Sequence, residues 1–183
     1  LKLLQKEGAL AFSFPVVTNC FGKHDYFGLG KGNFIPVIIR QLHNAKINNN
    51  KKFNFYGAKN KLIDFINSDD VADALVLLSH DNYSGIFNVA TGVVYTLREV
   101  VDVISTAIEF DGFIDETQIF SCDATSKTIN IDKILDLGWK PKFDLQAGID
   151  QTVEWFQSNL GTCRGMIELD HPFMKRDFFV TLD

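Results

Sequence analysis

Glycines and histidines are the residues whose types and spacing first suggest chemistry. Gly28, Gly30 and Gly32 lie close together, as in a phosphate-binding loop. A dinucleotide-binding fingerprint, however, needs its third glycine three positions after the second, between a strand and a helix. These glycines follow a long polar segment, so we interpret them as a flexible loop that enters a helix. Among the histidines we retain only His24, beside Asp25 in the same loop, as a candidate for a place near a ligand.

Nucleophiles and metal ligands are not arranged as a catalytic site. No serine or cysteine stands in a nucleophile-elbow setting. The three cysteines, Cys20, Cys122 and Cys163, are far apart and in no metal-ligand spacing, so we expect reduced thiols and no metal site. The paired acids Asp69 and Asp70 open an apolar helix, where capping and the helix dipole explain them. We therefore assign no catalytic residue to this chain.

Composition and charge exclude several classes of function. The 183 residues are 46% hydrophobic with a mean hydropathy of +0.02, which suits one globular core. The net charge is -5 and the lysines and arginines are scattered, so we expect no nucleic-acid partner. The apolar stretches are too short to span a bilayer, and no signal peptide is visible. The expected reduced thiols are typical of a cytosolic protein, so we expect a cytoplasmic location.

Helices are expected to alternate with short strands, which predicts an α/β class with parallel crossovers. We predict helices over 1–7, 33–46 with Asn33 as its cap, 69–79 with Asp69 or Asp70 as its cap, 97–110 behind a Thr96–Glu99 capping box, 132–138, and 145–160 behind Asp144. We predict strands over 9–17, 53–56 and 85–90, a long loop over 19–32, and a tail over 166–183. The strands 53–56 and 85–89 are expected to be neighbours or near-neighbours, outside the main sheet or at its edge.

Four stretches, taken in order, carry a family resemblance. They are Val17-Thr-Asn-Cys-Phe-Gly-Lys-His-Asp25, Asn33-Phe-Ile-Pro36, Phe55-Tyr-Gly57 with Asp64-Phe65, and Phe87-Asn-Val-Ala-Thr-Gly92 with Leu137-Gly-Trp-Lys-Pro141 after it. Together they resemble the C-terminal half of the extended short-chain dehydrogenase/reductases that act on nucleotide sugars. This is the NAD-dependent epimerase/dehydratase family, which includes the GDP-fucose synthases.

The resemblance implies a fold and a division of labour. We expect part of a Rossmann-type parallel sheet with a small C-terminal α/β substrate-binding region, residues 1–165 forming this half and 166–183 a tail or linker. In the family an N-terminal half carries the glycine-rich turn, and a Tyr–Lys pair lies on the helix before the point where this chain opens. Neither feature occurs in this sequence. We therefore predict no oxidoreductase turnover by the chain alone.

What carries over from the family is a binding shell. Cofactor contacts, to NAD or NADP, fall on Val17, Thr18, Asn19, Cys20 and Asn33, and substrate contacts fall on Asn33, Gln41, Tyr56 and Ile63. We expect Asn19 and Asn33 to border one ligand cavity.

Three of these positions depart from the pattern of the fucose synthases or the wider family. Asn33 stands where fucose synthases have a histidine acid, and an asparagine cannot titrate; in many epimerases of the family this residue is an asparagine that binds substrate phosphate. Ile63 replaces an arginine that clamps the diphosphate, and Gln41 replaces a second substrate arginine. Both Ile63 and Gln41 could instead be packing residues.

Two functions remain open at this point. The first is the substrate-binding portion of an NAD(P)-dependent nucleotide-sugar epimerase, dehydratase or reductase, with a nucleotide sugar as its partner and a homodimer as its candidate assembly. The second is a non-catalytic sugar-nucleotide-binding or interaction module with a degenerate site. A glycine-rich strand-turn-helix and a Tyr–Lys pair encoded upstream of Leu1 would decide for the enzyme.

Overall fold

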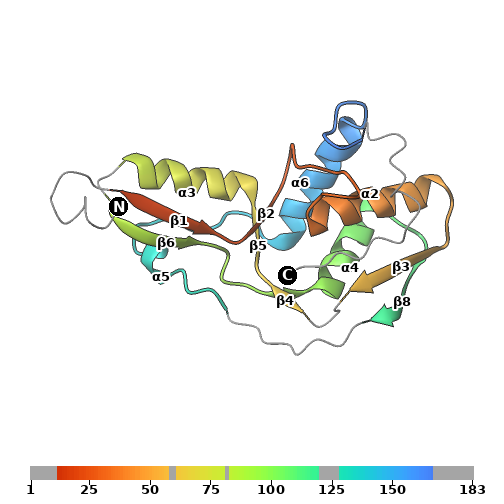
Figure 1. The fold of residues 1–183 in the computed structure, drawn as a ribbon, viewed down its shortest axis with the longest axis horizontal. Coiled ribbons are helices and arrows are strands. Elements are labelled where there is room, and N and C mark those ends of the chain that lie inside the picture. The colour runs from red at the N-terminus through yellow and green to blue at the C-terminus, as the bar shows by residue number, and fades with distance from the viewer. Residues whose placement is uncertain (1–11, 58–60, 81–82, 120–127, 167–183) are drawn as a thin grey trace.

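Helices and short strands alternate along the chain in the computed structural model, which describes residues 12–57, 61–80, 83–119 and 128–166 (Figure 1). The helices are α2 (Phe34–Ile47), α3 (Ser68–His80), α4 (Leu97–Ile108), α5 (Asp132–Leu135) and α6 (Leu145–Ser158). The strands are β1 (Ser13–Val17), β2 (Asn19–Phe21), β3 (Lys52–Gly57), β4 (Leu62–Ile63), β5 (Phe65–Asn67), β6 (Gly85–Val89), β7 (Tyr95–Thr96) and β8 (Phe113–Ile119). The predicted helix 1–7, the start of the strand 9–17 and residues 167–183 of the predicted tail lie outside the described residues.

Within the described residues the strands pair two by two. β1 is parallel to β6, β2 to β5 and β3 to β8, whereas β4 and β7 are antiparallel. The α/β class with parallel crossovers is therefore confirmed. The predicted neighbourhood of β3 and β6 is wrong, because β6 pairs with β1 at one end of the molecule and β3 with β8 at the other (Figure 1). The partner of β3 was missed because the sequence of β8 does not alternate between apolar and polar residues.

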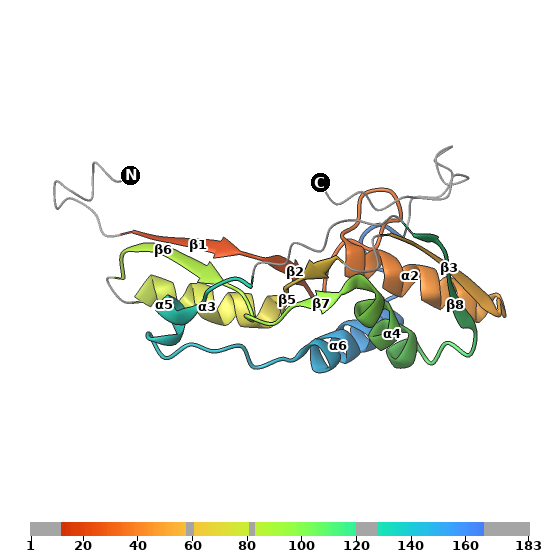
Figure 2. The ribbon, with the colours of Figure 1, turned by 90° about the horizontal axis from the view of Figure 1, so that it is seen from below.

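Two hydrophobic cores divide the molecule into two lobes. One core lies between α3, α5 and the β1–β6 pair, where Ile66, Phe87 and Ile134 are buried. The larger core joins α2, α4, α6 and β3, and α4 packs against both α2 and α6 (Figure 2). β2, β4, β5 and β7 lie between the lobes, so the residues at this junction are held from both sides.

The capping signals hold for α4 and α6. Thr96 accepts a hydrogen bond from the Glu99 backbone at 3.1 Å, and the Glu99 carboxylate accepts one from the Thr96 backbone at 2.7 Å. The Asp144 carboxylate accepts from the Ala147 backbone N–H at 2.8 Å. Both predicted caps are confirmed, because each depends on residues three apart in the sequence and on nothing more distant.

The predictions for α3 need two corrections. Its first turn is capped by Asn67, whose side-chain oxygen accepts from the Asp69 backbone N–H at 2.8 Å, and not by Asp69 or Asp70. The apolar spacing of Val71, Leu75 and Leu78 predicts that all three are buried, but Leu75 is 43% exposed. Asp70 is buried instead, since its carboxylate accepts hydrogen bonds from the backbone N–H groups of residues 142 and 143, and this turns the buried face away from Leu75.

Candidate functional site

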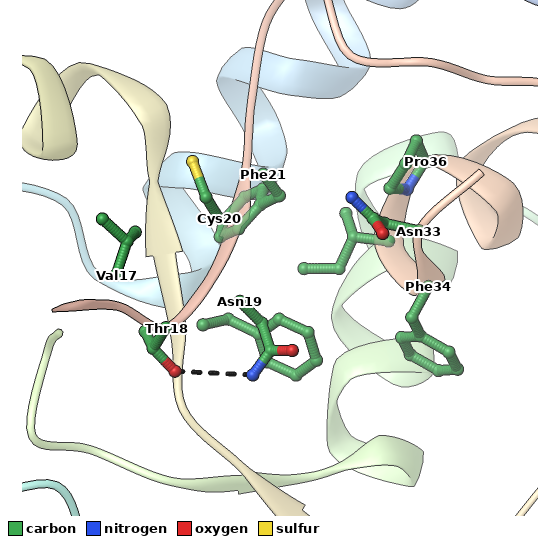
Figure 3. Close-up of a pocket in the computed structure, with 10 residues that line it drawn as sticks. Val17, Thr18, Asn19, Cys20, Phe21, Asn33, Phe34 and Pro36 are labelled. Carbon is green, nitrogen blue, oxygen red and sulfur yellow. Dashed lines mark hydrogen bonds between the residues drawn. The ribbon is translucent and has the colours of Figure 1, made fainter. Parts of the chain in front are cut away.

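A cavity of about 380 Å³ lies at the junction between the two lobes (Figure 3). Residues 17–21 form one wall, residues 33–36 form another, and Phe65 completes the lining. A volume of this size is within the range of small-molecule sites, and its lining of apolar and aromatic groups with a few polar ones is typical of them.

The first wall exists because the chain changes sheets at Thr18. β1 ends at Val17 against β6, and β2 begins at Asn19 against β5, so the backbone passes from one parallel pair to the next within one residue. The Thr18 backbone N–H donates to the Val89 carbonyl at 3.2 Å, which anchors this crossing point. In α/β proteins ligands bind at the carboxyl ends of parallel strands, where the connections diverge. The predicted loop 19–32 therefore begins as strand β2, because the pairing with β5 lies far away in sequence.

Thr18 and Asn19 are fixed by one backbone carbonyl. The Thr18 hydroxyl donates to the carbonyl oxygen of Asp64 at 3.0 Å, and the Asn19 side-chain nitrogen donates to the same oxygen at 3.1 Å. Asn19 also reaches the Thr18 hydroxyl oxygen at 3.4 Å (Figure 3). The polar edge of the cavity is thereby positioned by the short link between β4 and β5.

Asp64 is held in turn by its own carboxylate. It is only 3% exposed, and one oxygen accepts from the backbone N–H and hydroxyl of Thr91 at 3.1 and 2.8 Å. The other oxygen accepts from the Gly92 N–H at 2.8 Å. Gly92 has a φ of 75°, a conformation that favours glycine. Sequence reasoning quoted these residues but missed their contact. A lone acid between two strands, with a Thr-Gly turn later in the chain, is the signal that was available.

Asn33 occupies the N-cap position of α2 without capping it. Its backbone is extended, and its side chain makes no cap hydrogen bond. An N-cap side chain bonds the second or third N–H of its helix, and Pro36, the third residue of α2, has none. The predicted capping role is therefore wrong, and the exposed amide is left at the rim of the cavity. The prediction that Asn19 and Asn33 border one cavity is confirmed.

The remaining predicted site residues lie elsewhere. Gln41 is half-buried two turns into α2, and Ile63, 8% exposed in β4, packs in the larger core. Neither lines the cavity. The backbone of Tyr56 pairs with Gln118 in β3–β8, and its side chain lies outside what the structure describes. The His24 ring packs against Trp155 at 4.5 Å between centroids rather than on the cavity.

Cys20 contributes a neutral thiol to the cavity wall. Burial raises the pKa of this thiol, and the nearby negative charge of Asp25 raises it further. The thiolate that a nucleophile or a metal ligand requires is therefore disfavoured at neutral pH. In the described part of the chain Cys20 and Cys163 are free thiols, and no cluster of His, Cys, Asp or Glu side chains could hold a metal ion. No helix among those residues is long and apolar enough to cross a membrane.

Comparison with known proteins adds a family to this geometry. Residues 1–90 match the model of the NAD dependent epimerase/dehydratase family. Over 145 residues the chain is 31% identical to GDP-L-fucose synthase 1 of Arabidopsis thaliana, and the match covers 78% of this chain and 45% of that protein. The chain is therefore similar to members of this family. It spans about half the length of the curated relatives it matches.

Solved structures show the same family fold. A GDP-L-fucose synthetase from Naegleria fowleri, solved bound to NADP, is 26% identical with a TM-score of 0.73, and the match covers 89% of this chain and 50% of that one. UDP-glucose 4-epimerase from Thermotoga maritima, solved with UDP-glucose, is 20% identical with a TM-score of 0.74 over 87% of this chain and 50% of that one. The predicted Rossmann-type α/β fold of the family is confirmed.

Proposed function

We propose that this chain is the substrate-binding portion of an NAD(P)-dependent enzyme that epimerises, dehydrates or reduces a nucleotide sugar. The observation that carries the proposal is that residues 17–20 and Asn33 line the same cavity. These are the segments to which the family resemblance assigns the nicotinamide end of the cofactor and part of the substrate. The Naegleria fowleri relative was solved with NADP and the Thermotoga maritima epimerase with UDP-glucose, which supports both ligand classes.

The cavity suits the nicotinamide end of a dinucleotide beside a sugar. Phe21, Phe34 and Phe65 offer apolar surface to a ring, and Thr18, Asn19 and Asn33 offer polar groups at its edge. A bound nicotinamide would supply the hydride chemistry. The residues of this chain would bind and orient the sugar and keep water from the reacting carbon. None of them titrates near neutral pH at the cavity, so the hydroxyl proton falls to the Tyr–Lys pair expected in the other half.

The exposed apolar face of β1 and β6 supports the proposal that this chain is part of a larger protein. Phe14 and Ile86, cross-strand partners, are 52% and 54% exposed, and Val16 beside them is also exposed. Within the described residues β1 pairs on one side only. We propose that a nucleotide-binding half adds a strand beside β1 and covers this face. A homodimer, a cytoplasmic location and the division into residues 1–165 and a tail remain parts of the proposal.

The second candidate is a non-catalytic module that binds nucleotide sugars. Ile63 favours it, because an isoleucine buried in the core cannot clamp a diphosphate as the family's arginine does. Asn33 does not discriminate between the two candidates, because many epimerases that the family resemblance brings in also have an asparagine at this place.

Both candidates are tested by comparing the full-length protein with the 183-residue chain. Each is assayed with NAD, NADP and their reduced forms against a panel of nucleotide sugars. We expect turnover from the full-length protein and none from the chain alone, because the chain lacks the glycine-rich turn and the Tyr–Lys pair. Binding without turnover by the full-length protein would favour the non-catalytic module. Turnover by the isolated chain would show that the catalytic residues lie in this chain and not in the other half. If the full-length protein neither binds nor converts any of these ligands, the proposal is refuted.

A further inference from the structure

The side-chain amide of Asn19 can adopt only one of its two orientations. The carbonyl oxygen of Asp64 can only accept hydrogen bonds, so the amide nitrogen must face it, at 3.1 Å. The Thr18 hydroxyl donates its hydrogen to that carbonyl, so its oxygen can only accept from the Asn19 nitrogen, 3.4 Å away. A flipped amide would place its oxygen against two acceptors. The nitrogen side of the amide therefore faces the wall.

The opposite atom of the amide, Oδ1, is left to the cavity. Figure 3 shows the nitrogen of Asn19 directed at Thr18 and the oxygen directed away from it, toward Phe34 on the other wall. No hydrogen bond from the described residues reaches this oxygen, and Asn19 is exposed. At this point the cavity presents a hydrogen-bond acceptor to its ligand.

The orientation depends on where the Asp64 carbonyl is held. The Asp64 carboxylate accepts three hydrogen bonds from the Thr91–Gly92 turn, at 2.8 to 3.1 Å. These bonds hold Asp64 in place, and its backbone carbonyl accepts the hydrogen bonds from the side chains of Thr18 and Asn19. Asp64 is buried and does not line the cavity, so its influence on a ligand passes through Asn19.

We propose that Asp64 is a positioning residue that locks the Asn19 amide with Oδ1 toward the cavity, so that Asn19 receives an N–H or O–H donor of the ligand. A phosphate oxygen, which can only accept, is disfavoured at this point. The identity of the ligand rests on the proposed function: the donor is the carboxamide N–H of the nicotinamide or a hydroxyl of the sugar.

The orientation is tested without any ligand by side-chain amide exchange. The full-length protein, isotope-labelled in its asparagine side chains, is compared with D64N and with the matched control D70N. Both substitutions replace a buried carboxylate that accepts backbone N–H groups on both oxygens. We expect the Asn19 amide protons to exchange more slowly than those of the exposed Asn50, and D64N alone to abolish this protection. Equal exchange of Asn19 and Asn50 in the wild type, or equal loss of protection in both variants, would overturn the positioning role.

The ligand donor is tested by pairing the variant N19A with altered ligands. One arm titrates the dinucleotide against an analogue whose carboxamide is replaced by an acetyl group, and the other titrates nucleotide sugars against deoxy analogues. In one arm the wild type should lose about fivefold in affinity when the donor is removed, and N19A should not discriminate. Equal discrimination by both proteins, or none in either arm, would overturn the ligand assignment. If no dinucleotide or nucleotide sugar binds, the proposed function and this ligand assignment fail together, and the exchange measurement still decides the orientation.

Discussion

Replacing Ile63 by arginine should lower the stability of the protein and raise its affinity for a nucleotide diphosphate sugar. Ile63 is 8% exposed, faces the larger core, and stands opposite Tyr95 in the antiparallel β4–β7 pair. Losing a buried isoleucine costs about 1.5 to 3 kcal/mol. An arginine stem can cover part of that surface while the guanidinium turns outward, so we expect the fold to survive. A total stability of about 5 to 15 kcal/mol is enough to absorb the loss.

The gain in affinity follows from the chemistry of the diphosphate. A bidentate, charge-assisted contact contributes about 1.5 to 3 kcal/mol, which corresponds to roughly tenfold to a hundredfold in Kd. This is the contact that the family resemblance places at position 63. The same substitution is therefore expected to lower the free energy of unfolding and to tighten ligand binding.

Urea denaturation and titration calorimetry of full-length I63R measure the two effects separately. I63L is the control, because it conserves volume and should cost less than about 1.5 kcal/mol with no change in affinity. A stability of I63R within about 0.5 kcal/mol of the wild type would refute the burial argument. Unchanged or weaker affinity in a folded I63R protein would mean that the diphosphate is held elsewhere.

Three further outcomes are expected from local geometry. Removing the α4 capping box by T96A should cost about 1 kcal/mol and lower Tm by about 2 to 4 °C in calorimetry; an unchanged Tm would contradict this. The hydrogen bonds from Thr96 hold the pKa of Glu99 below its usual range. The larger effect comes from the Thr96 backbone N–H, which T96A keeps, and the smaller from the hydroxyl, which T96A removes. The stabilisation is present above about pH 4.3 and is lost as pH falls through the lower folded pKa. Denaturation at several pH values should therefore show a slightly shallower acid limb for T96A, and parallel limbs would count against this. G22A should lower the free energy of unfolding by about 1 to 3 kcal/mol, because the added Cβ would lie 2.1 Å from the Ser68 hydroxyl oxygen. G161A is the control, since a Cβ there meets nothing within 4 Å. Equal stability of the two variants in urea would disprove the close contact.

The parts of the fold that were predictable are those with local causes. For α4, the capping box and the apolar spacing of Leu97, Val100, Val101 and Ile104 predicted both its start and its buried face, and all four residues are buried. The helix 145–160 was predicted in the same way, and α6 begins where Asp144 caps it. In such elements each decisive residue lies within four positions of its partner.

The parts that were missed depend on distant partners. β2, β4, β5 and β7 have two or three residues each, too few for a periodic signal, and exist through pairing across the chain. Half of the site was predictable by resemblance, because residues 17–20 and Asn33 do meet at one cavity. The role of Asp64 could not be read from the sequence, because its partners lie 27 and 28 residues away.

The central claim is that the cavity between residues 17–21 and Asn33 is where a nicotinamide meets a sugar. A crystal structure of the full-length protein with a nicotinamide dinucleotide and a nucleotide sugar tests it most directly. We predict the nicotinamide ring and the sugar ring together in this cavity, with the Asn19 oxygen within hydrogen-bonding distance of an N–H or O–H donor. Both ligands bound away from Thr18, Asn19 and Asn33 would contradict the account.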